Sequence, residues 1–589
     1  MTSNDKRSAC LAFLRNPRTW VLLILLSIAA GGGAAAWQVG AQRGITREGA
    51  WLLEASAQRE DFYRRWCRGG AKGVIEREAV TQAFAPHGGL PPLMPAWVAT
   101  AKGLGAKKHA AHLALQANAL LFACLILLIG LMGLEAGGAL GAIVAALGAA
   151  TLPRLLGIAS MVGFSTSAVF FTTLAIFLLH RSRLSTVAGL GAVLALAAAL
   201  QSSLIGLFAW LPWLYTSVVG TSLPQRGNGL AQTPPVALRF LWIVPAGLAL
   251  GFAAYPYLWF ETKQAANIWL THFLRQPADP FAYAGTLWGQ ARMPWHAAPY
   301  LVFATLPPVY LLLACVGWRG GAIYHWIARK RPLTWLMRLP FAPREDSGHP
   351  LTLLEPTKAR EALLRLAKVS LVLALLLPLL LRTPYFGGID LIAFALPWLL
   401  VFAAAGTGRL VAVAMDLVPW RPSPTRWLAL GQAVLITAFL LLIVLPPLFE
   451  ARRYQPYFEA YYSWFVGGPQ GARDRGLPRY PYAPMPSEVL TLSRPATTAD
   501  LNAEFRVAKL LNDKRPDALR LAVAARLFPT WIKESVVFDA EIIILPHDDL
   551  DPAYEERANT FYRSVASGWD MIIYERGGVP LFTVATRAQ

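Results

Sequence analysis

Long apolar runs that recur along most of the chain are the feature that most restricts its fold. A helix needs about 20 consecutive apolar residues, within a range of roughly 17–25, to cross a bilayer. Such runs lie near 20–37, 111–133, 136–153, 164–180, 185–201, 203–220, 238–258, 298–317, 366–382, 390–407 and 427–447. The sequence therefore predicts an α-helical polytopic membrane protein with about eleven spans, of which the pair at 185–220 could instead be broken or re-entrant.

Composition supports this class and argues against a nucleic-acid partner. Of the 589 residues, 55% are hydrophobic and only 15% are charged, whereas a soluble protein carries about a quarter charged residues. The formal net charge is +20, a value that in a soluble protein would suggest nucleic-acid binding. Here the basic residues lie between apolar runs, where the preference of Lys and Arg for the cytoplasmic side explains them. We therefore predict membrane lipids, and no nucleic acid, as partners.

The basic loops also orient the chain in the membrane. HRSR (180–183), ARKRPLTWLMR (328–338) and WRPSPTR (420–426) all fall on one side if there are eleven spans. Because positively charged loops stay cytoplasmic, the N-terminus is predicted inside and the C-terminus outside a cytoplasmic (inner) membrane.

This orientation divides the chain into two predicted domains. Residues 1–449 form the transmembrane domain, with exterior loops at 38–110 and 259–297 and a basic cytoplasmic loop at 318–365. Residues 450–589 form a C-terminal domain that is periplasmic or extracellular. Its apolar segments ALRLAVAARLF, ESVVFDAEIIILP, WDMIIYERG and VPLFTVATR predict the short strands and helices of a small α/β fold.

Acidic side chains gather at the start of the first exterior loop. ITREGAWLLEASAQREDFYRRW contains four of them, Glu48, Glu54, Glu60 and Asp61. A carboxylate near the membrane can act as a general base, since a low-dielectric environment tunes its pKa. The alternative is a solvated amphipathic helix, in which these acids pair with the arginines Arg47, Arg59, Arg64 and Arg65.

The same loop ends in HGGLPPLMPAW (87–97), which combines a tight Gly-Gly turn with a Pro-Pro pair. Backbone of this kind survives at membrane depth only against protein or a wet cavity. MPAW then favours a helix lying in the interface, where Trp is enriched.

Taken in order, these segments resemble the GT-C glycosyltransferases. The nearest resemblance is to family 39, the polyprenyl-phosphate-sugar transferases that include protein O-mannosyltransferases and the lipid A aminoarabinose transferase. The resemblance rests on the acid-bearing first loop, the Pro-Pro-Leu element and four further segments. These are TLPRLLGIASMVGFSTSAVFFTTLAIFLLHR (151–181), YAGTLWGQARMPWHAAPYLVFATLPPVYLLL (283–313), GGIDLIAFALPWLLVFAAAGTGRL (387–410) and YFEAYYSWFVGGPQGARDRG (457–476).

Four positions depart from the pattern of the family. Arg47 precedes Glu48 where an Asp-Glu pair is usual, and His87 lies three residues upstream of the Leu-Pro-Pro-Leu that replaces His-Pro-Pro-Leu. Ser165 takes the place of an Asp, and no Arg follows Asp390 until Arg409.

The resemblance implies an inverting transfer of a sugar from a polyprenyl-phosphate donor to a hydroxyl of a lipid, glycan or protein acceptor. Glu48, with Asp61 as the second choice, would deprotonate the acceptor. Substrate and phosphate contacts are implied for Arg43, His87, Pro91, Pro92, Arg154, Ser165, Lys263 and Arg292. Arg suits phosphate because its planar fork carries several donors, although Arg154 could equally be an ordinary span-end arginine that reaches the interface.

Two other readings stay open. The departures allow a catalytically degenerate homologue that binds a lipid-linked sugar or a partner without turnover. A transporter is less favoured, because the acids lie in exterior loops and the chain shows no internal repeat. No cofactor is assigned. HAAH (109–112) has a metal-compatible spacing without an evident third ligand, so a divalent metal stays an open alternative and no metal site is assigned.

Overall fold

The structure is a computed structural model. It describes residues 17–42, 47–69, 76–85, 92–106, 110–182, 185–221, 236–267, 281–288, 294–329, 358–380, 390–417, 426–455, 458–477, 521–523, 542–546, 569–576 and 579–587. The predictions for Arg43, His87, Pro91 and Arg292 fall outside these ranges, and so does most of the basic loop 318–365.

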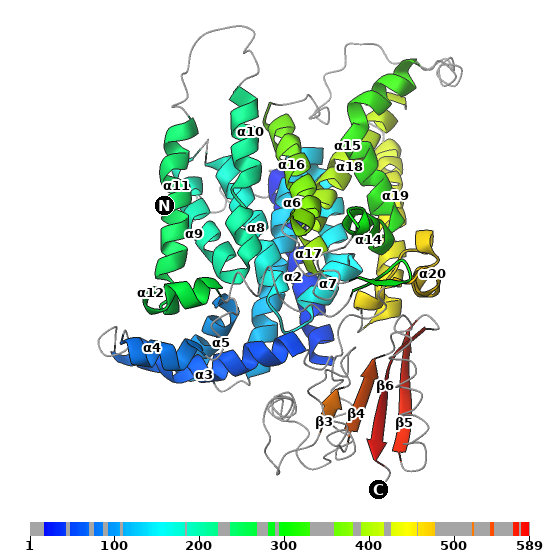
Figure 1. The fold of residues 1–589 in the computed structure, drawn as a ribbon. Coiled ribbons are helices and arrows are strands. Elements are labelled where there is room, and N and C mark those ends of the chain that lie inside the picture. Colours follow the sequence, from blue (N-terminus) through cyan, green and yellow to red (C-terminus); the bar gives the residue numbers. More distant parts are fainter. Residues whose placement is uncertain are drawn as a thin grey trace, which may run out of the picture.

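A bundle of upright helices forms most of the described molecule (Figure 1). Its members in chain order are α2 (Pro17–Gln42), α6 (Ala110–Thr151), α8 (Ser165–Arg181), α9 (Thr186–Ser202), α10 (Leu211–Thr221), α11 (Val236–Ala253), α15 (Pro308–Arg329), α16 (Lys358–Leu380), α18 (Leu396–Leu417) and α19 (Arg426–Tyr454). Shorter helices join them, namely α7 (Pro153–Ala159), η2 (Leu204–Phe208), α12 (Tyr257–Phe260), α14 (Ala297–Thr305) and α17 (Asp390–Ala393).

Helix α6 is two antiparallel arms rather than one rod. Its backbone leaves the helical region at Gly138, with φ 71° and ψ −165°, a conformation that only glycine adopts readily. Beyond this point the chain runs back beside its first arm. The contacts across the two arms show this: a Cβ built on Gly133 would lie 2.8 Å from the Cβ of Ala145, and one built on Gly130 would lie 3.3 Å from that of Ala146. The two arms correspond to the apolar runs 111–133 and 136–153.

Two predicted spans are interrupted. The run 298–317 is divided between α14 and α15 at Leu306 and Pro307, and the run 390–407 between α17 and α18. In the first case proline is the cause, since it lacks the amide donor and disfavours helix in the residue before it. The run 203–220 begins as the five-residue 3-10 helix η2 before α10, which agrees with the expectation that this region could be broken.

Aliphatic side chains cover the outer faces of several bundle helices. Within the described residues, α2 (Thr19–Ala41) and α6 are both long and apolar enough to cross a bilayer by length and composition, while other apolar helices are shorter. Exposed large side chains include Leu22, Leu23, Ile24 and Leu26 on α2, Val187, Leu190 and Leu194 on α9, and Leu441, Leu442, Leu445, Leu448 and Phe449 on α19. Apolar patches of this extent are expected against lipid rather than water.

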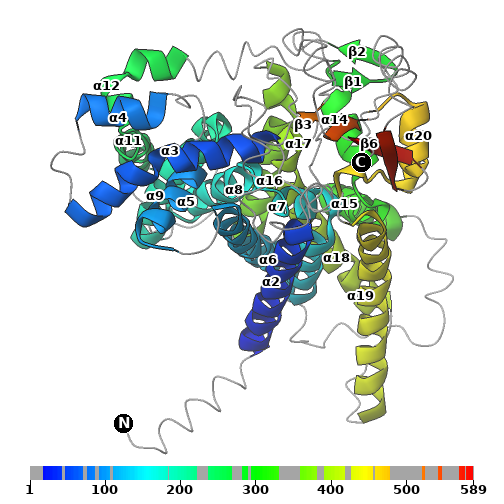
Figure 2. The ribbon, with the colours of Figure 1, turned by 90° about the horizontal axis from the view of Figure 1, so that it is seen from below.

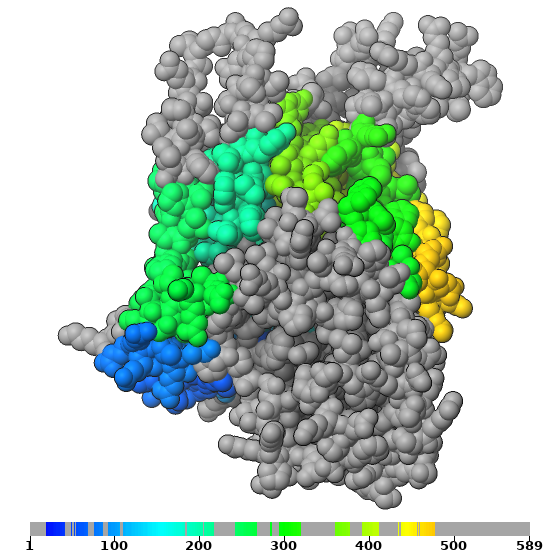
Figure 3. Space-filling view, in the orientation of Figure 1, coloured from blue at the N-terminus to red at the C-terminus, as the bar shows by residue number. Residues whose placement is uncertain are grey.

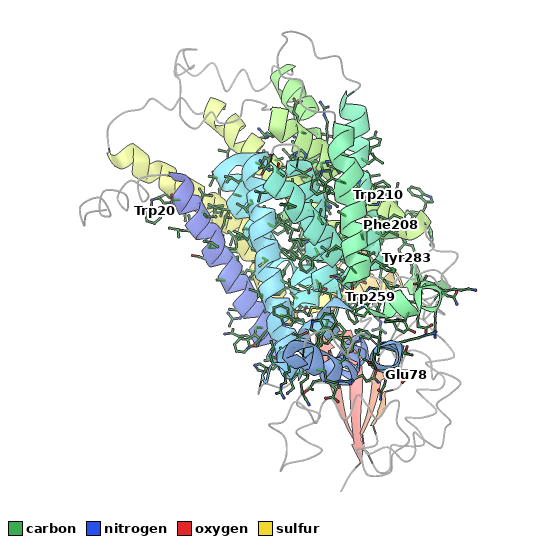
Figure 4. The ribbon with its side chains drawn as sticks, turned by 90° about the vertical axis from the view of Figure 1, so that its left-hand side faces the viewer. Trp20, Glu78, Phe208, Trp210, Trp259 and Tyr283 are labelled. Atoms are coloured by element: carbon green, nitrogen blue, oxygen red, sulfur yellow. The ribbon has the colours of Figure 1, made fainter. Side chains whose placement is uncertain are left out.

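Three helices lie across one end of the bundle instead of along it. These are α3 (Arg47–Gly69), α4 (Arg77–Phe84) and α5 (Leu93–Gly103), which we call the platform (Figures 1 and 2). Figure 4 shows Glu78 of the platform at the lower end of the molecule and Trp20 toward the other end of α2. In the space-filling view the surface of α4 continues directly into that of α12 (Figure 3).

A four-stranded sheet lies at the same end of the molecule as the platform (Figure 1). Its strands are β3 (Leu521–Val523), β4 (Ile542–Pro546), β5 (Trp569–Arg576) and β6 (Val579–Arg587), in the order β3-β4-β6-β5. Strands β3 and β4 are parallel and the other pairs are antiparallel. All four strands fall within segments that the sequence assigned to the C-terminal α/β domain, and the division into two domains stays a prediction.

Candidate functional site

The platform is attached to the bundle by two apolar clusters. Near the start of α3, Leu52 and Leu53 are buried with Leu115 of α6 and with Val162 and Phe164, the residues that follow α7. This cluster places the first turns of α3 beside the connection between α7 and α8. Glu48 lies in the first turn of α3, and its side chain, like that of Glu54, is outside the described residues.

The second cluster is aromatic and joins α3 and α4 to the end of α11. Phe62 and Phe84 meet edge to face with their ring centroids 5.2 Å apart, and Phe84 meets Tyr255 in the same way at 5.5 Å. The guanidinium of Arg59 lies 4.6 Å from the centroid of the Phe84 ring, a cation–π contact.

The remaining described acids of α3 are both paired with one arginine. Asp61 is 78% exposed and lies 3.1 Å from the guanidinium of Arg64. Glu60 is paired with the same arginine at 2.5 Å, four residues along the helix. This part of α3 is therefore the solvated amphipathic helix that the sequence offered as the alternative, and Asp61 lies in water rather than at a low-dielectric boundary.

Arg154 is the candidate residue with the most specific surroundings. It follows Pro153 at the start of α7, a helix whose seven residues are all buried, and only 1% of its own surface is exposed. One guanidinium nitrogen donates to the main-chain carbonyl of Tyr461 at 3.0 Å. The guanidinium carbon also lies 5.3 Å from the ring centroid of Tyr462. The interpretation of Arg154 as a span-end residue that reaches the interface is wrong, because the segment 458–477 covers it.

Tyr461 links Arg154 to an acid that the sequence analysis did not select. Its hydroxyl donates to a carboxylate oxygen of Glu450 at 2.5 Å, and Glu450 lies near the end of α19. Burial raises the pKa of Glu450, and the hydrogen bond from Tyr461 lowers it by less. Burial and the neighbouring Glu450 raise the pKa of Tyr461 as well. We call Arg154, Glu450, Tyr461 and Tyr462 the arginine–tyrosine cluster.

The cluster joins two segments that resemble separate elements of the family. Arg154 belongs to the Pro-Arg segment 151–181, and both tyrosines belong to the segment 457–476. The sequence alone predicted no role for either tyrosine. The signal that could have selected Glu450 is its place next to the end of the last apolar run, at 427–447, where an acid would meet an exterior site.

The other described candidates lie apart from this cluster. Pro92 is buried at the start of α5. Ser165 is half-buried and begins α8, and Lys263 is exposed after α12. A groove of about 310 Å³ lies elsewhere again and is lined by Ala30, Gly33, Ala34, Trp37, Gln116, Ala119, Leu120 and Ala123 of α2 and α6. Among the described candidates, Arg154 has a buried hydrogen bond to a distant segment, and Asp61 has an exposed ion pair on its own helix.

No group of three or more His, Cys, Asp or Glu side chains suitable for a metal ion occurs among the described residues. His112 lies edge to face with Trp37, with centroids 5.6 Å apart, and His109 falls outside the described part. A metal at HAAH stays untested.

The comparisons with known proteins give one weak likeness. No family model matches the chain, and no curated protein matches it. The crystal structure of ArnT from Cupriavidus metallidurans bound to undecaprenyl phosphate is similar with a TM-score of 0.38 and 14% identity, over 97% of this chain and 98% of that chain. The apo structure of the same protein gives a TM-score of 0.37 and 14% identity, over 96% and 98% of the chains. These TM-scores are too low to equate the folds, so no residue role is taken from ArnT.

Proposed function

We propose that the protein is an integral membrane glycosyltransferase that transfers a sugar from a polyprenyl-phosphate donor to an acceptor hydroxyl at the outer face of the cytoplasmic membrane. One observation carries this proposal. The Pro-Arg segment and the Tyr-Tyr segment, which resemble elements of family 39 transferases and lie about 300 residues apart, meet through the buried Arg154 and the carbonyl of Tyr461.

The arginine–tyrosine cluster has the chemistry to hold a phosphate that leaves. A guanidinium offers planar donors to two phosphate oxygens at once. Donors fixed in a site that excludes water stabilise the charge of a leaving group far more than they would in bulk water. The hydrogen bond to the carbonyl of Tyr461 and the ring of Tyr462 fix Arg154 in position before any substrate binds.

The platform would supply the base. In an inverting transfer, Glu48 takes the proton of the acceptor hydroxyl while the acceptor oxygen bonds to the anomeric carbon. The bond from that carbon to the donor phosphate oxygen breaks, and the phosphate keeps the electron pair. Glu48 is favoured over Asp61, because Asp61 is exposed to water and already paired with Arg64.

The test is a transfer assay with polyprenyl-phosphate sugars and the full-length protein in lipid. Glu48→Gln should lower the rate about 100-fold or more, because general-base catalysis contributes roughly 10²–10⁴-fold. Glu60→Gln is the matched control: it removes a carboxyl from the same helix that is paired with Arg64, and it should keep turnover within about twofold. Equal rates for Glu48→Gln and the wild type would remove Glu48 from the role of base.

Arg154→Gln tests the phosphate site separately. We expect it to weaken the binding of polyprenyl phosphate and to lower the rate about 100-fold, as the loss of one fixed donor to a developing charge does. Thermal unfolding of the variant checks that the bundle is intact. Unchanged binding in a folded Arg154→Gln protein would contradict the proposed phosphate site.

The degenerate homologue is kept as a second candidate because of Ser165. This residue begins α8 where the family pattern has an Asp, so a second acid is missing. Polyprenyl phosphate bound by the wild type, without turnover across a panel of sugar donors, would favour this candidate over the transferase.

A further inference from the structure

We propose that Asn118 of α6 is a positioning residue for the transfer, because it fixes the helix that begins with Glu48, α3, relative to the helix that carries Arg154, α7. This inference rests on the proposed function, since it concerns the geometry between the base and the arginine that holds the phosphate. Asn118 is fully buried. It acts through the residues 160–164, which connect α7 to α8.

Asn118 bonds this connection to the bundle. Its Nδ2 donates to the main-chain carbonyl of Met161 at 2.6 Å and to that of Gly163 at 3.4 Å. Both carbonyls lie in a buried segment between two helices, and a buried carbonyl without a partner costs free energy. The Oδ1 of Asn118 has no hydrogen-bond partner among the described residues, so the amide holds the connection through its donor side.

The connection is also bonded to α7. The hydroxyl of Ser160 donates to the carbonyl of Gly157 at 2.9 Å. From the other side, the hydroxyl of Thr166 in α8 donates to the carbonyl of Ile158 at 3.1 Å. A shift of the connection relative to α7 would break these bonds, so the connection and α7 form one unit.

The first turns of α3 pack against the same connection. Val162 and Phe164 are buried together with Leu52 and Leu53 of α3. Leu52 lies four residues after Glu48 and therefore on the same side of the helix, one turn away. The connection thus contacts the start of α3 on one side and continues α7 on the other, and Asn118 holds it in place.

Loss of this hold should act on the rate rather than on donor binding. A displacement of about 1 Å in a catalytic geometry can lower a rate about 100-fold. Arg154 keeps contacts of its own to the carbonyl of Tyr461 and the ring of Tyr462. When the connection loosens, the start of α3 should therefore move while the phosphate site stays intact.

The test measures steady-state transfer and hydrogen exchange on the full-length protein in lipid. Asn118→Leu removes the amide at similar size. It should lower kcat about tenfold or more and leave KM for the polyprenyl-phosphate sugar within about twofold. Exchange should become faster in the first turns of α3 and stay as in the wild type in α9, because local opening reports local attachment.

Arg409→Gln is the matched control. Arg409 of α18 also donates to two main-chain carbonyls of another segment, those of Val316 and Gly317 in α15. Neither α15 nor α18 contributes a residue to the apolar cluster around Leu52. Arg409→Gln should therefore keep kcat within about twofold, with unchanged exchange in α3, even where it lowers the midpoint of thermal unfolding.

Val162→Ala decides the question if Asn118→Leu fails to fold. It keeps the hydrogen bonds of Asn118 and removes part of the contact with α3, so it should lower kcat with KM unchanged. A folded Asn118→Leu protein with wild-type kcat and wild-type exchange in α3 would overturn the proposal, and so would an equal loss of kcat in Arg409→Gln. Absence of transfer by the wild type would contradict the proposed function instead, and the exchange of α3 would still decide whether Asn118 fixes this helix.

Discussion

Arg154 and Glu450 contact the same tyrosine through different atoms. Arg154 donates to the main-chain carbonyl of Tyr461, and the phenol of Tyr461 donates to Glu450. Tyr461 therefore connects Glu450 to the arginine that we assign to the donor phosphate. The protonation state of Glu450 is the simplest way to probe this connection.

We expect Glu450 to make the stability of the protein depend on pH. Its pKa in the folded state is raised by burial, above the value of about 4.3 for an unfolded chain. The folded state then binds the proton more tightly, so the contribution of Glu450 to stability is fully present below pH ~4.3 and is lost as pH rises through the folded pKa. Glu450→Gln should match the wild type at low pH and become the more stable protein as pH rises.

Thermal unfolding of both proteins between pH 4 and pH 8 measures this difference. Tyr461→Phe supplies the control, because it removes the hydrogen bond that lowers the pKa of Glu450. In a Tyr461→Phe background the effect of Glu450→Gln should extend to higher pH. A difference that is constant over the whole range would show that Glu450 titrates alike in the folded and unfolded states.

Sequence reasoning at the residue scale selected Arg154 but not its environment. The Pro-Arg pair starts α7, and a local pattern can indicate that. The burial of Arg154 comes from Tyr461 and Tyr462, about 300 residues later, and no spacing within the sequence reports such a contact. For Asp61 the sequence did indicate the environment: the nearby arginines predicted a solvated helix, and the structure pairs Asp61 with Arg64.

At the scale of elements, the length of an apolar run predicts the helices of this chain well, whereas breaks within a helix are predicted poorly. The apolar runs coincide with helices α2, α8, α9, α11 and α19 to within a few residues at most of their ends. The break at Leu306–Pro307 comes from proline, and apolar composition is the same on both sides of this break and of the break between α17 and α18. The platform helices were expected only as amphipathic or interfacial segments, and their position across the bundle end depends on tertiary contacts.

Glycine packing gives a prediction for the pair α15 and α18. A Cβ on Gly406 would collide with the carbonyl oxygen of Leu313, so Gly406→Ala must force the helices apart and should cost about 1–3 kcal/mol of stability. Gly189→Ala is the matched control in α9, where the nearest atom to the new Cβ is Cδ1 of Ile243 at 3.5 Å.

The control variant should be neutral, or more stable by up to about 1 kcal/mol, because alanine favours a helix over glycine. The midpoint of thermal unfolding in one detergent or lipid compares the two variants. An equal loss of stability in the two variants would show that α15 and α18 do not cross as closely as they do in the structure.

At the scale of the whole molecule, charge and shape indicate the same orientation. The platform and the four-stranded sheet lie at one end of the bundle (Figure 1), and both belong to stretches that the charge distribution places outside. Arg181 ends α8 and Arg360 lies in the first turn of α16, on the opposite side. For a chain with net charge +20, the positive-inside rule then predicts one orientation in the membrane.

The cysteines allow this orientation to be tested in the natural sequence. Cys67 is exposed on α3 of the platform, so a thiol reagent that cannot cross membranes should label intact cells at this residue. Cys124 and Cys315 lie in α6 and α15, within apolar runs. A reagent that cannot cross membranes stays in water and does not enter the hydrocarbon, so these two should react slowly.

Cys67→Ser should therefore abolish most of the labelling, and opening the cells should add labelling at Cys10, which is predicted in the cytoplasm. If intact cells are still labelled after Cys67→Ser, or if Cys67 is labelled only after the membrane is opened, the chain has the opposite orientation. The platform would then face the cytoplasm, and the proposed sugar transfer would have to use a donor on the inner side. One labelling experiment thus decides on which side of the membrane the proposed transfer takes place.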